Sequence, residues 1–166
     1  MSNILAKFKS INTFVFDVDG VFTDSSLLVT EEGDLLRIMN ARDGYALRHA
    51  IDRDYKIVII TGGNSAGVQK RLEGLGTKHV YSAVKDKWKL YQELVSSGLI
   101  DKETSIYMGD DIPDRELMQQ VPLSACPSDA ASEILEVADY VSPFKGGHGA
   151  VRDLVQTILK VQGKWL

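Results

Sequence analysis

The sequence has a single cysteine and four prolines, and it has no long apolar run. Cys126 on its own cannot form a disulfide within the chain or build a thiolate metal cluster, so we expect a small core residue. No apolar run approaches the ~20 residues of a membrane span, and the N-terminal segment MSNILAKFKS lacks the apolar stretch of a secretory signal. We therefore expect no membrane partner and a cytoplasmic location.

Positive charge is also scarce. The chain has 19 lysines and arginines against 23 aspartates and glutamates, a formal net charge of -4. Nucleic acids are held by clustered basic side chains, so we do not expect a nucleic-acid partner. A phosphorylated small molecule would have to be held locally, by a metal ion or a pocket.

The remaining composition is that of a globular protein. Of the 166 residues, 44% are hydrophobic and 25% are charged, and the mean hydropathy is -0.09. A chain of this length can bury a core without metal or disulfide support. We expect one domain over residues 1–166, with one active site.

The hydrophobic pattern alternates between two periods. Short apolar runs, rich in β-branched and aromatic residues, occupy residues 13–18, 56–60, 79–82, 105–108 and 123–125. Helical patterns occupy residues 45–53, 65–75, 87–97, 114–120, 130–137 and 150–161. This alternation predicts an α/β fold, a Rossmann-like three-layer αβα arrangement around a parallel sheet. Residues 25–39 break the rhythm with two apolar runs around a turn at 31–34, which predicts an inserted β-hairpin.

Carboxylates follow two of the predicted strands. Asp17 and Asp19 follow the first strand, and Asp110, Asp111 and Asp114 follow the fourth core strand. Ligands of open parallel sheets bind beyond the carboxyl ends of the strands, where such loops converge. Carboxylates ~4 Å apart repel by roughly 4 kcal/mol per pair at an effective dielectric of about 20, so the cluster needs a cation. Oxygen-only ligation favours Mg²⁺.

Groups suited to phosphate follow two other strands. Thr61, Gly62 and Gly63 offer a hydroxyl and backbone N–H groups at the start of a helix, which suits a phosphate oxygen. Lys87, with Lys85 as the alternative, could balance charge between the phosphate and the carboxylates.

The four motifs occur in a fixed order. Asp-x-Asp-Gly at 17–20, Thr-Gly at 61–62, the lysine at 87 and Gly-Asp-Asp-x-x-Asp at 109–114 resemble the haloacid dehalogenase superfamily of phosphatases over nearly the whole chain. The resemblance implies that Asp17 attacks phosphorus to form an aspartyl phosphate. It also implies that Asp19 protonates the leaving alkoxide and then activates water.

The same resemblance assigns the remaining site residues. Thr61 and Lys87 would hold the transferring group. Asp110 would bind Mg²⁺ together with the carboxylate of Asp17 and the backbone carbonyl of Asp19. Asp111 and Asp114 would support that ligand shell, although acids after a strand could equally cap the next helix.

The segment between residues 61 and 87 is too short for a cap domain, and the hairpin is the only earlier insertion. The chain therefore resembles the capless subgroup of the superfamily. That resemblance implies a homotetramer, in which the hairpins form a barrel and a neighbouring subunit covers each active site.

Three further segments, 17–24, 40–44 and 145–152, resemble members that act on phosphorylated sugar acids for lipopolysaccharide synthesis. The implied substrate is a deoxyulosonate phosphate of eight or nine carbons, for which arginine forks are suitable partners. The implied substrate contacts are Asp19, Asn40, Ala41, Arg42, Asp43, Gly44, Arg48, Gly62, Gly63, Arg71 and Lys87. Gly63 and His148 stand where many relatives have arginine.

Two functions of other classes are open to such a sequence. Receiver domains gather acids, a hydroxyl residue and a lysine at the edge of a similar sheet, but their phosphorylated aspartate follows a later strand. A scaffold that keeps the fold without catalysis would not need intact motifs. The pair Asp17 and Asp19, followed by Gly20, favours turnover.

Overall fold

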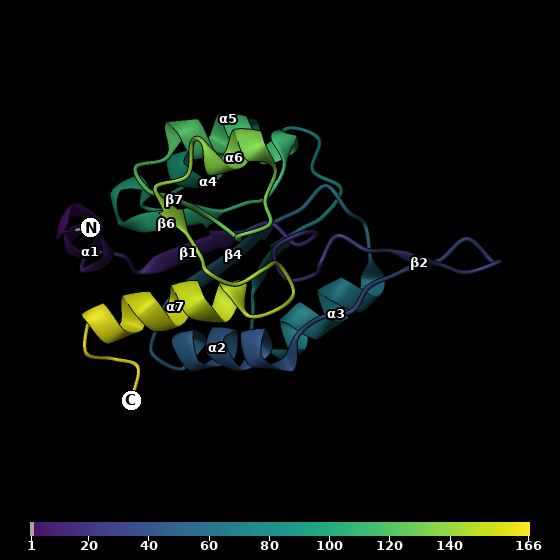
Figure 1. Ribbon diagram of the computed structural model, residues 1–166, viewed down its shortest axis with the longest axis horizontal. Helices are drawn as coiled ribbons and strands as arrows, with labels where there is room; N and C mark the ends of the chain where they lie inside the picture. The colour runs from purple at the N-terminus through teal and green to yellow at the C-terminus, as the bar shows by residue number, and fades with distance from the viewer. Residues whose placement is uncertain (1) are drawn as a thin grey trace.

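The computed structural model describes residues 2–166, which form a six-stranded parallel sheet with helices on both faces (Figure 1). The strand order is β5-β4-β1-β6-β7-β8. The strands are β1 (Thr13–Phe16), β4 (Lys56–Ile60), β5 (His79–Tyr81), β6 (Ser105–Met108), β7 (Ser124–Cys126) and β8 (Tyr140–Val141). The predicted three-layer α/β class is confirmed.

The helices divide into two layers, which lie above and below the sheet in Figure 1. One layer holds α2 (Ala41–Ile51), α3 (Ala66–Gly74) and α7 (Ala150–Val161), with α1 (Ser2–Phe8) beside them. The other layer holds α4 (Lys87–Ser96), α5 (Ile112–Gln120) and α6 (Ser132–Leu135), and a 3-10 turn (Lys102–Thr104) precedes β6. Among the described residues, no helix is both long enough and apolar enough to cross a membrane.

The central strand β1 shows why two layers are needed. Phe14 and Phe16 pack in the core beneath α2 and α7, whereas Val15 between them packs in the core of α4 and α5. All three side chains are fully buried. Each such burial contributes about 1.5–3 kcal/mol, so a sheet with apolar residues on both faces requires helices on both.

Most predicted boundaries agree with the structure to within one or two residues. Helix α2 is the exception, because it begins at Ala41 rather than at residue 45. The side chain of Asn40 accepts a hydrogen bond from the backbone N–H of Arg42 and caps this earlier start. The sequence pattern missed α1 and the two-residue strand β8, both of which are too short to show a clear period.

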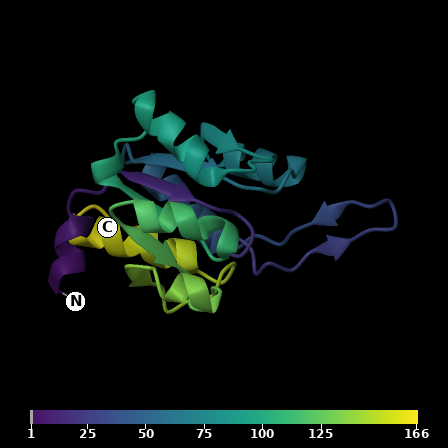
Figure 2. The same ribbon diagram turned by 90° about the horizontal axis from the view of Figure 1, so that it is seen from above.

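The predicted hairpin is confirmed, with strands of only two residues each. Strands β2 (Leu28–Val29) and β3 (Leu35–Leu36) pair antiparallel, and the hairpin extends well beyond the body of the protein (Figure 2). Between β4 and β5 the chain forms only α3 and its connections, so no cap domain is inserted among the described residues.

The loop that precedes α7 closes against the loop that follows β1. The backbone N–H of Gly147 donates to the carbonyl of Val21 at 3.0 Å. At Gly146 the backbones approach so closely that an added Cβ would lie 1.8 Å from the carbonyl oxygen of Gly20. The two loops therefore fix each other's positions.

We expect Gly146→Ala to lower the free energy of unfolding by about 3 kcal/mol, because the new methyl group would force these backbones apart. Urea denaturation of the purified variant measures this change. Gly74→Ala is the matched control, since an added Cβ there has no neighbour within 4 Å, and it should change stability by less than about 1 kcal/mol. Equal effects of the two substitutions would contradict the packing argument.

Candidate active site

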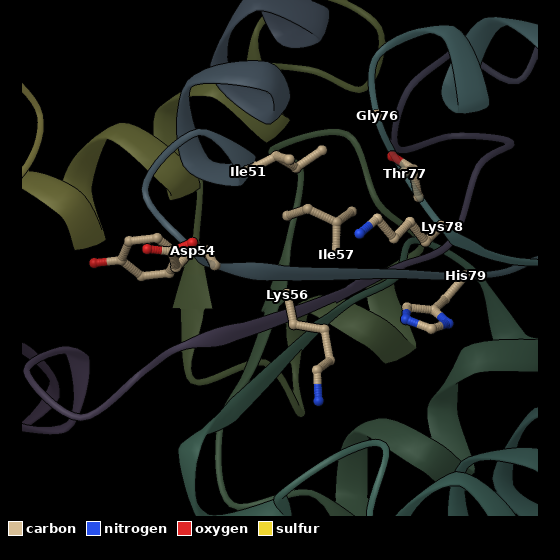
Figure 3. A pocket seen from close by; sticks show the side chains of 9 residues that line it. Ile51, Asp54, Lys56, Ile57, Gly76, Thr77, Lys78 and His79 are labelled. Carbon is tan, nitrogen blue, oxygen red and sulfur yellow. The ribbon is translucent and has the colours of Figure 1, made fainter.

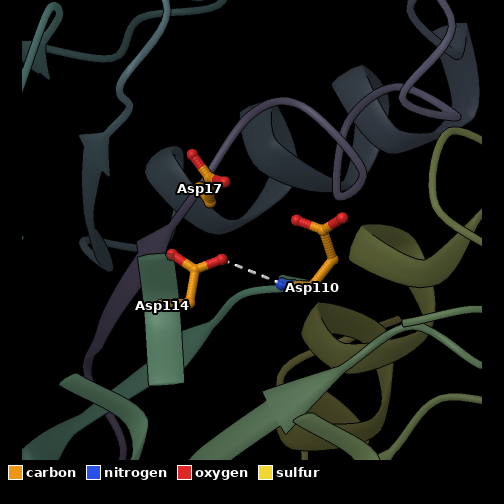
Figure 4. A group of neighbouring side chains, drawn as sticks. All are labelled: Asp17, Asp110 and Asp114. Atoms are coloured by element: carbon orange, nitrogen blue, oxygen red, sulfur yellow. Dashed lines mark hydrogen bonds between the residues drawn. The ribbon is translucent and has the colours of Figure 1, made fainter. Parts of the chain in front are cut away.

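The carboxylates after β1 and β6 meet at one edge of the sheet, because these strands are parallel neighbours in register. Oxygen atoms of Asp17, Asp110 and Asp114 all lie within 4.8 Å of one another (Figure 4). Figure 4 shows the three side chains pointing toward a common space from the ends of these strands and the start of α5. The structure thus brings the predicted acids together.

Gly20 makes this convergence possible. Its φ angle is +80°, in the left-handed region that favours glycine. A Cβ at this position would lie 1.8 Å from an Oδ2 atom of Asp110. A side chain here would displace Asp110 from the cluster.

Lys87, the first residue of α4, supplies the positive charge. Its Nζ lies 2.9 Å from Oδ2 of Asp17 and 2.5 Å from Oδ1 of Asp114, and the side chain is only 5% exposed. Burial by itself would lower the pKa of Lys87, but the charges of Asp17 and Asp114 outweigh it and raise the pKa. Lys87 therefore stays protonated.

Asp114 is fully buried, and both of its oxygens are occupied. Oδ1 also accepts a hydrogen bond from the hydroxyl of Tyr107 at 2.5 Å, and Oδ2 accepts from the backbone N–H of Asp110 at 3.0 Å. Asp111 and Asp114 form a capping box at the start of α5. Helix capping and support of the acid cluster are therefore compatible in these two residues.

Asp17 and Asp110 carry the unbalanced negative charge. Burial, followed by repulsion from Asp114, raises the pKa of Asp17 from 3.8 to about 7, although Lys87 opposes the shift. Burial, followed by repulsion from Asp17 and Asp114, raises the pKa of Asp110 to about 8. Oδ1 of Asp17 is buried and has no hydrogen-bond partner among the described residues. An oxygen-only donor set with excess charge and a free buried oxygen fits a divalent cation such as Mg²⁺.

The phosphate-binding groups line the same cavity as the acids, which has a volume of about 450 Å³. Thr61 is 4% exposed, and its Oγ1 accepts a hydrogen bond from the backbone N–H of Gly63 at 3.1 Å. Gly62, Gly63 and Lys85 also line the cavity. The arrangement places hydroxyl, amide and ammonium donors around one anion-sized space beside the acids.

Several residues that the sequence analysis did not single out contact this site. The hydroxyl of Ser25 lines the cavity and donates to Oδ2 of Asp110 at 3.5 Å. Tyr107 donates to Asp114 from within β6, and nothing in an apolar strand marks one tyrosine as special. Arg37, from the end of the hairpin, forms an ion pair with Asp19 at 2.7 Å between Nε and Oδ1, and this hydrogen bond raises the pKa of Arg37. A lone arginine after a predicted strand gives no sequence signal of this contact.

The segment 40–44, which was predicted to contact substrate, lies outside the acid cavity. Asn40 caps α2, and its Nδ2 donates to the carbonyl of Gly147 at 3.2 Å. Asp43 is completely buried, and it accepts a hydrogen bond from the backbone N–H of Arg152 at 2.8 Å in the first turn of α7. Ala41 and Arg42 are exposed, and Gly44 is buried. Within one chain, these residues join α2 to α7 and do not line the acid cavity.

The predicted arginines are also separate from the acids. Arg48 pairs with Asp52 at 2.9 Å on the surface of α2. Arg42 and His148 line another cavity, together with Arg152. Arg71 lines a groove of about 910 Å³ between the hairpin and α3, which Arg37 also lines. This groove adjoins the acid cavity through Arg37, which pairs with Asp19.

A further cavity of about 270 Å³ lies at the opposite, amino ends of β4 and β5 (Figure 3). Figure 3 shows Lys56 and His79 pointing away from Ile51 and Ile57, on the other side of the strands. The polar groups of this cavity at the amino ends of the strands do not converge on one point, in contrast to those of the acid cavity.

The chain is similar to known proteins over nearly its whole length. Residues 79–154 match the haloacid dehalogenase-like hydrolase family. The 3-deoxy-D-manno-octulosonate 8-phosphate phosphatase of Escherichia coli K12 is 36% identical over 163 residues, which cover 98% of this chain and 87% of the relative. The crystal structure of the Yersinia pestis phosphatase of the same name is 36% identical and superposes with a TM-score of 0.93, covering 98% of this chain and 88% of that one.

A third relative was solved with ligands. The Moraxella catarrhalis phosphatase of this name, in complex with a magnesium ion, a phosphate ion and KDO, is 30% identical with a TM-score of 0.95. The match covers 99% of this chain and 95% of that one.

The raised pKa values predict how stability depends on pH. Because folding raises the pKa of Asp17 and Asp110 above 3.8, the folded state favours their protonated forms. The free energy of unfolding of the metal-free protein should therefore fall as the pH rises from about 4 through about 8. We expect a melting temperature roughly 5 °C or more lower at about pH 8 than at about pH 5.5, as measured by calorimetry with a chelator.

Added Mg²⁺ should remove most of the difference in melting temperature between the two pH values. Asp110→Asn should raise the melting temperature of the metal-free protein at the higher pH. Glu116→Gln, at an exposed acid outside the cluster, is the matched control. A metal-free protein that is more stable at the higher pH would contradict the assignment of the shifts.

Proposed function

This chain belongs to the haloacid dehalogenase-like hydrolases, and on that premise we propose that it is a Mg²⁺-dependent phosphatase of 3-deoxy-D-manno-octulosonate 8-phosphate. Residues 1–166 act as a single hydrolase domain in this proposal. The observation that carries it is the buried, unpartnered oxygen of Asp17, which lies beside Lys87 and the carboxylate of Asp110.

Asp17 is the nucleophile. Its carboxylate oxygen forms a bond to phosphorus, the ester P–O bond breaks, and the electron pair of that bond moves to the leaving sugar oxygen. Asp19 gives a proton to this oxygen. Asp19 then takes a proton from a water molecule that attacks phosphorus, which breaks the bond to Asp17 and releases inorganic phosphate. Atoms and charges balance over the two steps.

The remaining residues hold the transferring group. The Thr61 hydroxyl, the backbone N–H of Gly62 and the Lys87 ammonium donate to phosphate oxygens, and such preorganised donors stabilise the charge of the transition state. Asp17, Asp110 and the backbone carbonyl of Asp19 would hold Mg²⁺, which would neutralise the negative charge that the carboxylates and the phosphate share. Tyr107 and two backbone N–H groups keep Asp114 in place for Lys87.

The relatives support the choice of sugar. The proteins described above are named as phosphatases of the eight-carbon sugar acid, and one was solved with KDO, phosphate and magnesium. A nine-carbon deoxynonulosonate 9-phosphate differs only in chain length, so it is the alternative that the experiment must separate. A receiver-like or scaffold role is disfavoured, because Asp19 lines the same cavity as Asp17 and the pair of acids suits turnover.

The test is a phosphate-release screen over deoxyulosonate phosphates of different chain length, with Mg²⁺. We expect the highest kcat/KM for the eight-carbon substrate. Asp17→Asn should lower kcat at least about 10³-fold, because an amide cannot act as the nucleophile. Asp54→Asn serves as the matched control and should retain activity. The absence of release from every sugar-acid phosphate would refute the proposal, and a preference for nine carbons would reassign the substrate.

The hairpin supports a proposal about assembly. Six apolar side chains of this segment are at least 43% exposed: Leu27, Leu28, Val29, Leu35, Leu36 and Ile38. An apolar hairpin that extends into solvent is an aggregation hazard unless another surface covers it. We infer that four chains associate through their hairpins and that each active site is covered by a neighbouring subunit.

The cytoplasmic location stays a prediction of the sequence.

The assembly is tested by replacing Leu28 and Val29 with aspartate. Light scattering of the unmodified protein should give four times the 18.3 kDa chain mass, and the double variant should give the mass of one chain. Charged side chains would make burial of the hairpin costly. Leu5→Asp, at an exposed leucine of α1, is the control and should not change the mass. A monomeric unmodified protein would refute the inference.

A further inference from the structure

The guanidinium of Arg37 holds both oxygens of Asp19. Nε lies 2.7 Å from Oδ1, and Nη2 lies 3.1 Å from Oδ2. The third nitrogen, Nη1, donates to the carbonyl of Leu35 in the hairpin at 2.8 Å. The Arg37 side chain is 7% exposed, whereas that of Asp19 is 35% exposed. Such a two-pronged contact is stronger than a single-point ion pair on the surface.

Gly63 leaves the room for this contact. A Cβ at position 63 would lie 3.1 Å from Oδ2 of Asp19 and 3.2 Å from Nη2 of Arg37. Both distances are tighter than ordinary packing, so a side chain there would press directly on the ion pair. The contact between Arg37 and Asp19 therefore depends on the absence of a side chain at position 63.

The ion pair conflicts with the proposed role of Asp19. An oxygen of Asp19 must face the leaving oxygen of the substrate, but in this structure the fork of Arg37 engages both oxygens. The pair therefore has to open before the leaving group can receive its proton. A competing anion that accepts the same two N–H groups would open it.

The position of Arg37 indicates where that anion would come from. Arg37 lines the groove between the hairpin and α3 and also pairs with Asp19 of the acid cavity, so it lies between the two spaces. The groove contains Arg71 and the start of α3, with Asp34 as its one acidic side chain. A substrate with phosphate in the acid cavity could extend a second anionic group into this groove.

We propose that Arg37 exchanges partners, holding Asp19 in the free protein and the carboxylate of the substrate in the complex. This inference rests on the proposed function, because it takes Asp19 as the group that serves the leaving oxygen. The exchange makes recognition of the carboxylate a condition for catalysis. Phosphomonoesters without a second anion leave Asp19 engaged and are turned over slowly. Arg37 is thus both a substrate contact and a positioning residue for Asp19.

The test compares two phosphomonoesters: 3-deoxy-D-manno-octulosonate 8-phosphate, and arabinose 5-phosphate, which has a terminal phosphate but no carboxylate. In Arg37→Ala we expect kcat/KM for the sugar-acid phosphate to fall by roughly 10- to 100-fold, because a two-pronged contact is lost. We expect kcat for arabinose 5-phosphate to rise severalfold, because Asp19 is released. These opposite signs distinguish partner exchange from a merely structural role, which would lower both.

Two further variants sharpen the comparison. Arg37→Lys keeps the charge but cannot form the fork, so its ratio of activities on the two substrates should be intermediate. Gly63→Ala should shift the ratio in the same direction as Arg37→Ala, because its methyl group presses on the pair. Arg53→Ala, at an arginine near the end of α2 away from the cavity, controls for loss of an arginine and should leave the ratio unchanged.

A binding measurement separates this inference from the proposed function. Calorimetric titration of the phosphate-free sugar acid into the Mg²⁺-loaded protein requires no turnover, and Arg37→Ala should weaken binding by roughly 10-fold or more. Equal affinity of the two proteins would overturn partner exchange, whether or not phosphate is released from any substrate. Equal losses of kcat on both phosphomonoesters would also overturn it and would leave the phosphatase function intact.

Discussion

Repulsion among buried carboxylates is the constraint on which the rest of the site depends. Asp17, Asp110 and Asp114 share one enclosed space, and Lys87 neutralises only part of their charge. The fold tolerates this because neighbouring strands and the Tyr107 hydroxyl hold the acids in place. The remaining charge attracts a divalent cation, and the neutralised site can then accept a phosphate dianion. The expected loss of stability without metal and the proposed phosphoryl transfer thus have one physical cause.

The hairpin connects this chemistry to the outer surface. Its two arms are apolar and exposed, which suits contact with other chains, and the end of its second arm places Arg37 on Asp19. A single short insertion therefore has two roles in our proposals. It provides an association surface, and its Arg37 binds the substrate carboxylate.

Much of the fold and the centre of the site could be predicted from the sequence, because the relevant signals are local. Short continuous apolar runs mark β4 and β6, and helical patterns mark the layers around them. Asp17 and Asp110 follow strands, and the carboxyl ends of parallel strands meet at one edge. Gly20 follows the first pair of acids, where the approach of Asp110 leaves no room for a Cβ.

The tertiary structure decided what depends on contacts between distant segments. Arg37 reaches Asp19, and Asp43 caps α7 across 109 residues of sequence rather than lining the acid cavity. Tyr107 looks like any other residue of an apolar strand until its hydroxyl is found on Asp114. Periodicity and motif order in the sequence determined the sheet, its helices and the acids. Packing alone chose the partner of each charged group, because a buried charge must be satisfied by whatever the folded chain brings within reach.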